Sequence, residues 1–269
     1  MKEVETETDK KRKFVIIDAQ TNARGRESSA LIENSPKLGA SSYDRPSSQQ
    51  ATSFDKTKLE QVGVIYPGMK DKEVLNAYRS LRLKLQSKME QFNSVILISP
   101  VGKKGSSAIA ALNLAVAFTL EHENHALLID FNSEREDLLE SLGVDENGGM
   151  YEFLAGSVTD FDNIVYPTTV PRLSIMPAGK SYSAEDEALE YWGGDKIETL
   201  MSDIKAQRQD RVIIINTPSI LASADTKLLA EFSDYVVLAL PYGRMTPMQI
   251  NKTVNEFGKD QVAGFVMMN

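Results

Sequence analysis

A loop with phosphate-binding features follows the first strongly apolar segment of the chain. Residues 99–118 read SPVGKKGSSAIAALNLAVAF, so a short apolar run leads through a turn rich in glycine and serine into an alanine-rich, helix-forming stretch. In such a turn the backbone N–H groups and the start of the helix face an anion. The full nucleotide motif needs Gly-Lys-Ser/Thr, which is missing here. The candidate binding residues are Gly102, Lys103, Lys104, Gly105, Ser106 and Ser107.

Other groups with chemical potential are better explained without chemistry. His122 and His125 stand three residues apart in EHENH, too few ligands for a metal site, so we expect a solvated turn. The acidic run at 184–190, AEDEALE, has the composition of a solvated helix face rather than of paired catalytic carboxylates. Trp192, before two glycines, is expected to anchor a loop.

Predicted helices and strands, which must position the loop, alternate along the chain. Periodic apolar residues predict an amphipathic helix over 71–90, and the run at 108–120 predicts a buried helix. Apolar runs of strand length follow at 95–99, 126–130, 173–176, 212–215, 235–240 and 264–268. Strands that are apolar on both faces and separated by helices predict a doubly wound α/β domain. Its mostly parallel sheet has helices on both faces, with functional loops at the carboxyl ends of the strands.

The domain division follows a change in composition. Residues 1–57 hold mixed charges and the serine- and proline-rich stretch 34–53, which predicts a disordered N-terminal tail before a domain at 58–269. Within the tail, FVIID (14–18) is either an incidental apolar patch or a peptide that docks on a partner or adds a strand to a sheet edge.

Composition excludes several classes of function. The 269 residues include no cysteine, which rules out disulfides, cysteine-based zinc sites and a cysteine nucleophile. The net charge of −8 argues against nucleic-acid binding. The apolar run at 108–120 is shorter than the roughly 20 residues of a membrane span. The charged N-terminus does not resemble a signal peptide, so we expect a cytoplasmic protein.

Several segments together resemble a known family. In order they read AYRSLRLKL (77–85), the glycine-rich loop, LLIDFNSERED (127–137), MYEFLAG (150–156), LSIMPAG (173–179), VIIINTPSIL (212–221) and DYVVLALPYGRMTP (234–247). This array resembles the cytoplasmic domain of bacterial tyrosine autokinases of exopolysaccharide and capsule synthesis. These have the P-loop NTPase-like fold of the deviant Walker class that also contains MinD and ParA. The resemblance covers about 59–269 and looks like the stand-alone members.

The chain departs from that family at three chemical positions. The resemblance places Gly105 where the phosphate-binding lysine belongs, while Asn132 and Asn216 stand where aspartates organise magnesium, and Asp130 is kept. Phosphoryl transfer depends on such preorganised charges, and the loss of one costs on the order of a hundred- to a thousand-fold in rate. We therefore expect ATP or ADP with magnesium, held by Ser106 and Asp130, to bind weakly or not at all.

The family's ring-forming ExxRxxR pattern survives in part. Arg79 and Arg82 remain, but Asn76 replaces the glutamate, so these arginines are either solvated or contact a subunit or partner. The sequence is therefore compatible with a homo-oligomer. The family's tyrosine acceptors have no evident counterpart among nine scattered tyrosines, of which Tyr43 is expected to be the most accessible.

The leading hypothesis is a catalytically degenerate relative acting as a regulatory or adaptor protein in exopolysaccharide or capsule synthesis and export. By resemblance its partner is an inner-membrane polysaccharide co-polymerase of the chain-length determinant type, which would recruit the chain to the inner face of that membrane. The alternatives are an active tyrosine autokinase with an unusual loop, and a MinD- or ParA-like positioning ATPase.

Overall fold

The computed structural model describes most of the region that the resemblance covers. Its described residues are 15–18, 52–102, 107–120, 124–132, 138–144, 148–179, 194–207, 209–243 and 245–268. Lys103, Lys104, Gly105, Ser106, His122, Trp192, Tyr43 and the acidic run at 184–190 therefore lie outside the described residues. None of the described helices is long and apolar enough to cross a bilayer.

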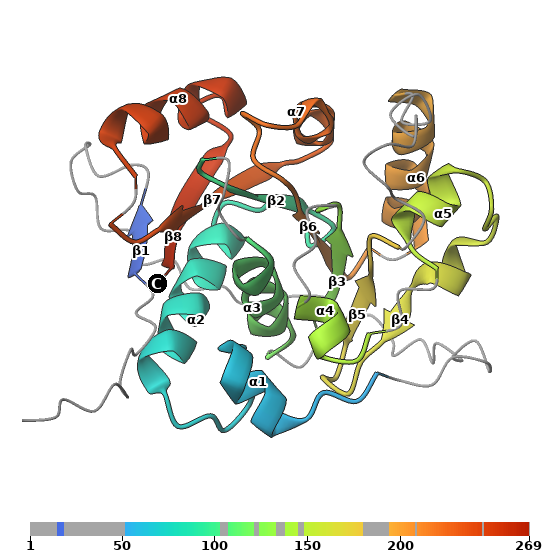
Figure 1. Ribbon diagram of the computed structural model, residues 1–269, viewed down its shortest axis with the longest axis horizontal. Coiled ribbons are helices and arrows are strands. Elements are labelled where there is room, and N and C mark those ends of the chain that lie inside the picture. The colour runs from blue at the N-terminus through green and yellow to red at the C-terminus, as the bar shows by residue number, and fades with distance from the viewer. Residues whose placement is uncertain are drawn as a thin grey trace, which may run out of the picture.

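A single eight-stranded sheet organises the described chain (Figure 1). Its spatial order is β1-β8-β7-β2-β6-β3-β5-β4, and the six strands from β8 to β5 run parallel to their neighbours. β1 and β4 pair antiparallel at the two ends. The strands are β1 (Val15–Asp18), β2 (Val95–Pro100), β3 (His125–Asp130), β4 (Tyr166–Pro167), β5 (Leu173–Met176), β6 (Arg211–Asn216), β7 (Tyr235–Pro241) and β8 (Val262–Met268). The predicted doubly wound α/β fold is confirmed.

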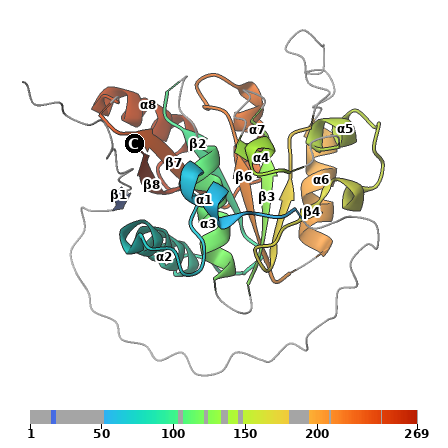
Figure 2. The same cartoon turned by 60° about the horizontal axis from the view of Figure 1, so that its bottom comes forward.

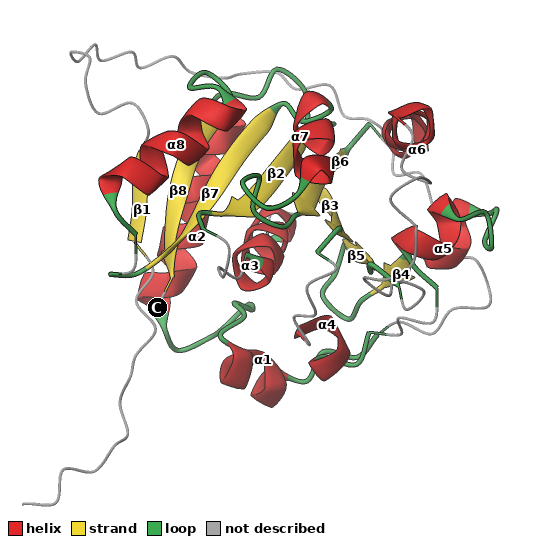
Figure 3. Ribbon diagram, turned by 45° about the horizontal axis from the view of Figure 1, so that its top comes forward, coloured by secondary structure: helices red, strands yellow, loops and turns green. Residues whose placement is uncertain are grey.

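Helices cover both faces of the sheet (Figures 2 and 3). They are α1 (Lys56–Val62), α2 (Lys72–Gln86), α3 (Ala108–Thr119), α4 (Leu138–Ser141), α5 (Met150–Leu154), the 3₁₀ helix η1 (Phe161–Ile164), α6 (Gly194–Gln207), α7 (Ala224–Glu231) and α8 (Pro247–Phe257). One apolar core lies under α1 to α4 and the other under α5 to α8. Along β2, Ile96 and Ile98 enter the first core while Val95 and Leu97 enter the second. This is why the strand is apolar throughout.

Local sequence explains where α2 begins and which of its sides is buried. Asp71 caps α2, because its carboxylate accepts hydrogen bonds from the backbone N–H groups of Glu73 and Val74. Periodic apolar residues then bury one side of α2 against α3, which is itself buried over almost its whole surface. In α3 the amide of Asn113 is fully buried. It accepts from the Ile65 N–H at 2.7 Å and donates to the Gly63 carbonyl at 3.1 Å.

The N-terminal region differs from the expected boundary at residue 58. Phe54 is buried in the first core and Asp55 caps α1, so the folded unit includes residues that were assigned to the tail from composition. Thr52 forms a parallel bridge with Thr168 beside β4. At the other end of the sheet, residues 15–18 form β1. Of the two interpretations of FVIID, the structure shows the added edge strand, because the outer backbone groups of β8 accept it.

Candidate functional site

The loop after β2 leaves the sheet at its centre. β2 ends at Pro100, and Gly102 adopts a left-handed conformation with φ of 88°, which a side chain would strain. A Cβ atom at Gly102 would lie 3.1 Å from Cε of Met245, so the loop between β7 and α8 lies directly against this turn. No role was predicted for Met245, whose only signal was its place in the segment 234–247.

Ser107 turns its hydroxyl toward the sheet. The residue precedes α3 and is fully buried, yet its side chain makes no capping hydrogen bond to the helix. Instead, Ser107 Oγ donates to Asn216 Oδ1 at 2.6 Å and lies 3.2 Å from the Thr217 carbonyl. This predicted loop residue is therefore brought together with a residue at the end of β6.

Asn216 joins the loop to the end of β3. It is opposite Asp130 in the parallel β3–β6 register, and its Nδ2 donates to Asp130 Oδ1 at 2.9 Å. The same Oδ1 atom accepts the Asn132 backbone N–H at 2.9 Å. Asn216 is 1% exposed, Asn132 7% and Asp130 9%. The structure thus brings together the three residues that the resemblance places at the carboxylate positions of the family.

The chemistry of this network depends on an amide at position 216. An asparagine side chain accepts through its oxygen and donates through its nitrogen, so it satisfies both Ser107 and Asp130. An aspartate there would place a second carboxylate against Asp130 in a buried site, an arrangement that requires a cation or a proton. With an amide at this position, hydrogen bonds link Ser107, Asn216 and Asp130 into one network.

The described donor set does not fit a magnesium-nucleotide site. Magnesium is bound through carboxylate and hydroxyl oxygens together with the phosphates, and the two neighbouring amides bring no charge. Asp130 is the one carboxylate in the network, and its Oδ1 already accepts two hydrogen bonds. Across the described residues, no group of three or more acidic or histidine side chains could hold a metal ion.

Neighbouring hydroxyl groups, which were not predicted, hold the strand ends in register. Ser99 Oγ donates to the Pro218 carbonyl at 3.0 Å, and Thr217 Oγ1 donates to the Ile98 carbonyl at 3.3 Å. Both side chains are fully buried. The signal was present in the sequence, since Ser99 follows one apolar run directly and Thr217 follows another after Asn216, and the two runs end at the same edge of a parallel sheet.

Two segments of the family-like array form a close backbone crossing. The N–H groups of Met150 and Tyr151 donate to the carbonyls of Pro177 and Ala178, both at 2.9 Å. Glu152 is buried and accepts from the Gly149 N–H at 2.8 Å. A Cβ at Gly179 would lie 1.9 Å from Glu152 Oε2 and would displace that carboxylate, at a φ of 100° that itself favours glycine. This crossing packs α5 onto the sheet beside the site.

The two arginines of α2 have different environments. Arg82 is 6% exposed, and its Nη1 donates to the Ala117 carbonyl of α3 at 3.3 Å. It is part of the contact between α2 and α3, so its side chain is not the solvated helix charge that was one of the two expectations. Arg79 lies on the exposed side of α2 with Asn76 and Leu83, whose side chain is 56% exposed.

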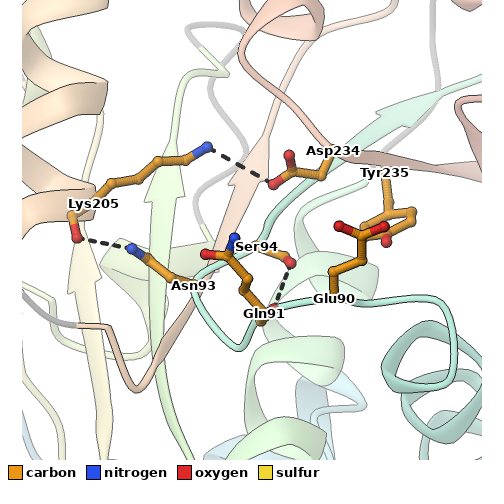
Figure 4. Close-up of a pocket in the computed structure, with 7 residues that line it drawn as sticks. All are labelled: Glu90, Gln91, Asn93, Ser94, Lys205, Asp234 and Tyr235. Carbon is orange, nitrogen blue, oxygen red and sulfur yellow. Dashed lines mark hydrogen bonds and ion pairs between the residues drawn. The ribbon is translucent and has the colours of Figure 1, made fainter.

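A second cluster of polar residues lies at the opposite end of the sheet. A cavity of about 380 Å³ opens where β2 and β7 begin, and Figure 4 shows its lining. Lys205 Nζ lies 3.8 Å from Asp234 Oδ2, which also accepts the Val95 N–H at 2.7 Å. Burial, followed by the charges of Asp234 and Glu90, raises the pKa of the Tyr235 phenol. Elsewhere, His125 Nε2 lies 3.7 Å from Asp210 Oδ2.

The position of this polar cavity argues against phosphate binding. Ligand sites in open α/β sheets lie outside the carboxyl ends of the strands, where helix N-termini meet. The cavity lies at the amino ends, and its charged groups interact with one another. The carboxyl-end network is therefore the stronger candidate site.

Sequence comparison relates the chain to kinases. EpsB of Ralstonia solanacearum, which bears the name of a tyrosine-protein kinase, is 29% identical over 188 residues, 69% of this chain and 24% of its own length. Tyrosine-protein kinase wzc of Salmonella typhimurium is 24% identical, over 72% of this chain and 26% of its own length. The chain thus spans about a quarter of the relatives that it matches. No protein-family model matches it.

Structural comparison agrees with the fold. The kinase domain of the Escherichia coli tyrosine kinase ETK aligns with a TM-score of 0.66 at 17% identity, covering 84% of each chain. The BceF tyrosine kinase domain aligns with a TM-score of 0.60 at 18% identity, covering 78% of this chain and 86% of its own. The resemblance found in the sequence is matched by both comparisons. The sequence relatives are named as tyrosine-protein kinases, and the structural neighbours are tyrosine kinase domains.

Proposed function

We propose that this chain is a homologue of the polysaccharide-biosynthesis tyrosine kinases that does not transfer phosphate. It acts as a regulatory or adaptor protein in exopolysaccharide or capsule synthesis and export. The sequence relatives and the fold support the pathway. One observation supports the loss of catalysis: at the end of β6 an amide, that of Asn216, donates to Asp130 where the family has a second carboxylate.

The physical reason is a competition for the same atoms. Magnesium is bound through one or two carboxylates together with phosphates, and here β3 supplies a carboxylate while β6 supplies an uncharged amide. An ion that took the place of the Asn216 amide at Asp130 would break a charge-assisted hydrogen bond in a buried site. Gly105, where the family has its lysine, removes a further positive charge from the loop.

The adaptor role needs a surface that remains available. Arg79 meets that requirement, because it is exposed on α2 beside the exposed Leu83. By resemblance, its partner is either a second subunit or the cytoplasmic part of an inner-membrane polysaccharide co-polymerase. Contact with such a partner would bring the chain to the inner face of that membrane.

Calorimetric titration with ATP and ADP, each with and without magnesium, tests the proposal. We expect no magnesium-dependent binding to the wild-type chain and no phosphotyrosine after incubation with magnesium-ATP. The matched control is the triple variant Gly105→Lys, Asn132→Asp, Asn216→Asp, which restores the family pattern. In this variant we expect magnesium-dependent heat of binding.

If the chain is instead an active autokinase, the expected phosphotyrosine result is the opposite. It requires phosphotyrosine on the wild-type chain, lost in Asp130→Asn, with Lys103 or Lys104 replacing the family's lysine. Phosphotyrosine that appears on the wild-type chain and disappears in Asp130→Asn would overturn the proposal. Tight magnesium-dependent ATP binding would do the same.

A further inference from the structure

The outer side of β8 is a strand-binding edge that the chain fills with its own N-terminal segment. β1 pairs antiparallel with β8, and the register places Val15 opposite Met267, Ile16 opposite Val266, Ile17 opposite Phe265 and Asp18 opposite Gly264. On its other side β8 is already paired with β7. Without β1, β8 would present an unpaired row of backbone donors and acceptors.

β1 is short and remote in sequence from the structure that it completes. It contributes four residues to the pairing, and the next described residue is Thr52. Thr52 lies beside β4, at the opposite end of the sheet. Residues 19–51 therefore connect two elements that lie roughly 35 Å apart, given about 4.8 Å between neighbouring strands.

The length of this connection permits pairing within one chain without enforcing it. The 33 residues from 19 to 51 can reach roughly 110 Å when fully extended, well beyond the separation required. A covalent connection of this length gives β1 an effective concentration on the order of millimolar at its own β8. A second copy offers the same backbone edge in the same register, so exchange replaces each backbone hydrogen bond with an equivalent one.

We propose that residues 15–18 of one copy pair with β8 of a second copy when copies are held close together. The outer edge of β8 is then a self-recognition site that takes an extended segment in antiparallel register. Exchange in both directions gives a closed two-fold pair. At micromolar concentration each chain fills its own edge, and near millimolar local concentration the partner's segment competes on equal terms. This inference does not depend on whether the chain transfers phosphate.

The absence of native cysteine makes a disulfide test clean. Side chains directly opposite in an antiparallel pair have Cβ atoms about 5 Å apart, close enough to form a disulfide with a small adjustment. The full-length double variant Val15→Cys, Met267→Cys reports pairing within one chain. A mixture of Val15→Cys copies with affinity-tagged Met267→Cys copies reports pairing between chains. Mixing Ile16→Cys with Met267→Cys is the control, because these positions are out of register.

After oxidation with glutathione disulfide, we expect the double variant to close internally at low micromolar concentration. We expect the mixture to give a covalent pair with one copy of each kind. Its yield should rise with concentration and exceed the out-of-register control several-fold near millimolar. A mixed pair no more abundant than the control at every concentration would overturn the exchange. Failure of the double variant to close would overturn the β1–β8 site itself.

Discussion

The two ends of the parallel sheet carry polar clusters of opposite character. At the carboxyl ends, Ser107, Asn216 and Asp130 are at least nine-tenths buried and linked by hydrogen bonds of 2.6 and 2.9 Å. At the amino ends, Lys205 and Asp234 keep 37% and 44% of their side-chain surface exposed and lie 3.8 Å apart. Among the described residues, the end that is richer in charge is therefore the one where an α/β sheet does not bind phosphate.

This difference shows that charge content is a poor guide to function. Buried groups at the carboxyl ends interact in a low dielectric, so exchanging one oxygen for an amide nitrogen decides whether the site needs a cation. Exposed groups at the amino ends are screened by water, and their interactions contribute little. Four substitutions test this contrast, in order of decreasing effect.

Asn216→Asp should be the most damaging single change. It places two carboxylates together in the buried network, and we expect the free energy of unfolding to fall by about 3 kcal/mol near neutral pH. Magnesium should recover part of that loss, because the cation neutralises the pair. Urea denaturation with and without magnesium chloride measures both effects.

Asn113→Asp is the matched control for that substitution. Asn113 is also a buried amide that accepts one hydrogen bond and donates another, but it lies on α3 against residues 63–65. We expect this variant to lose stability without recovery by magnesium. Equal recovery in both variants would show that the carboxyl-end network has no special relation to a cation.

Ser107→Ala should have the next largest effect. It leaves the oxygen of Asn216 buried without the hydroxyl donor that it has in the wild-type chain, at a cost of about 1–3 kcal/mol. A double-mutant cycle with Asn216→Ala isolates the interaction between the two side chains. A coupling energy near zero would mean that the network does not act as a unit.

Lys205→Met at the amino end should change stability by less than about 1 kcal/mol. Its ion pair with Asp234 is half exposed, so water and salt weaken it. Thermal denaturation at low and high salt should show a difference from wild type that shrinks as salt rises. A loss as large as that of Ser107→Ala would remove the contrast between the two ends.

Asp234→Asn should lower the pKa of Tyr235 without disturbing the carboxyl-end network. Burial is the largest cause of the raised pKa, and the negative charges of Asp234 and Glu90 add to it. The unfolded chain loses the tyrosine proton near the ordinary pKa of 10.0, before the folded chain does. The free energy of unfolding therefore falls as the pH rises from 10.0 to the pKa of the folded state, and the variant should make this pH range narrower. Ultraviolet titration of tyrosinate, with Tyr235→Phe subtracted, measures the shift. An unchanged Tyr235 curve would remove Asp234 as a cause.

The central strands could be predicted from the sequence, since runs that are apolar on both faces have few other solutions. The strand expected at 173–176 matches β5. The run at 95–99 ends one residue before β2 does, and the run at 212–215 is one residue shorter than β6 at each end. The helix α1 was not predicted, although Asp55 and Gly63 are ordinary cap residues that bracket it. The intervening KTKLEQV offers little apolar periodicity, and besides its caps the helix is stabilised by the packing of Leu59 in the first core.

For the site, the resemblance identified which positions would meet but not how they would interact. That Asp130, Asn132 and Asn216 lie together follows from parallel strands ending at one edge. The burial of Arg82 could not be predicted from spacing, because a long side chain on an amphipathic helix can lie along either face. The contact of Met245 with Gly102 could not be predicted either, because it depends on the path of a loop.

The pairing of β1 with β8 joins two strands that are synthesised at very different times. β1 is the first described element to be synthesised and its partner is the last, with Val15 opposite Met267. At roughly 5–20 residues per second, the segment waits about 10–50 s for its own β8 to emerge. Throughout this interval the segment can pair with the β8 of a neighbouring finished chain whenever that chain's own β1 detaches. Neighbouring ribosomes on one message would therefore bring β1 and a foreign β8 together before the chain could close on itself.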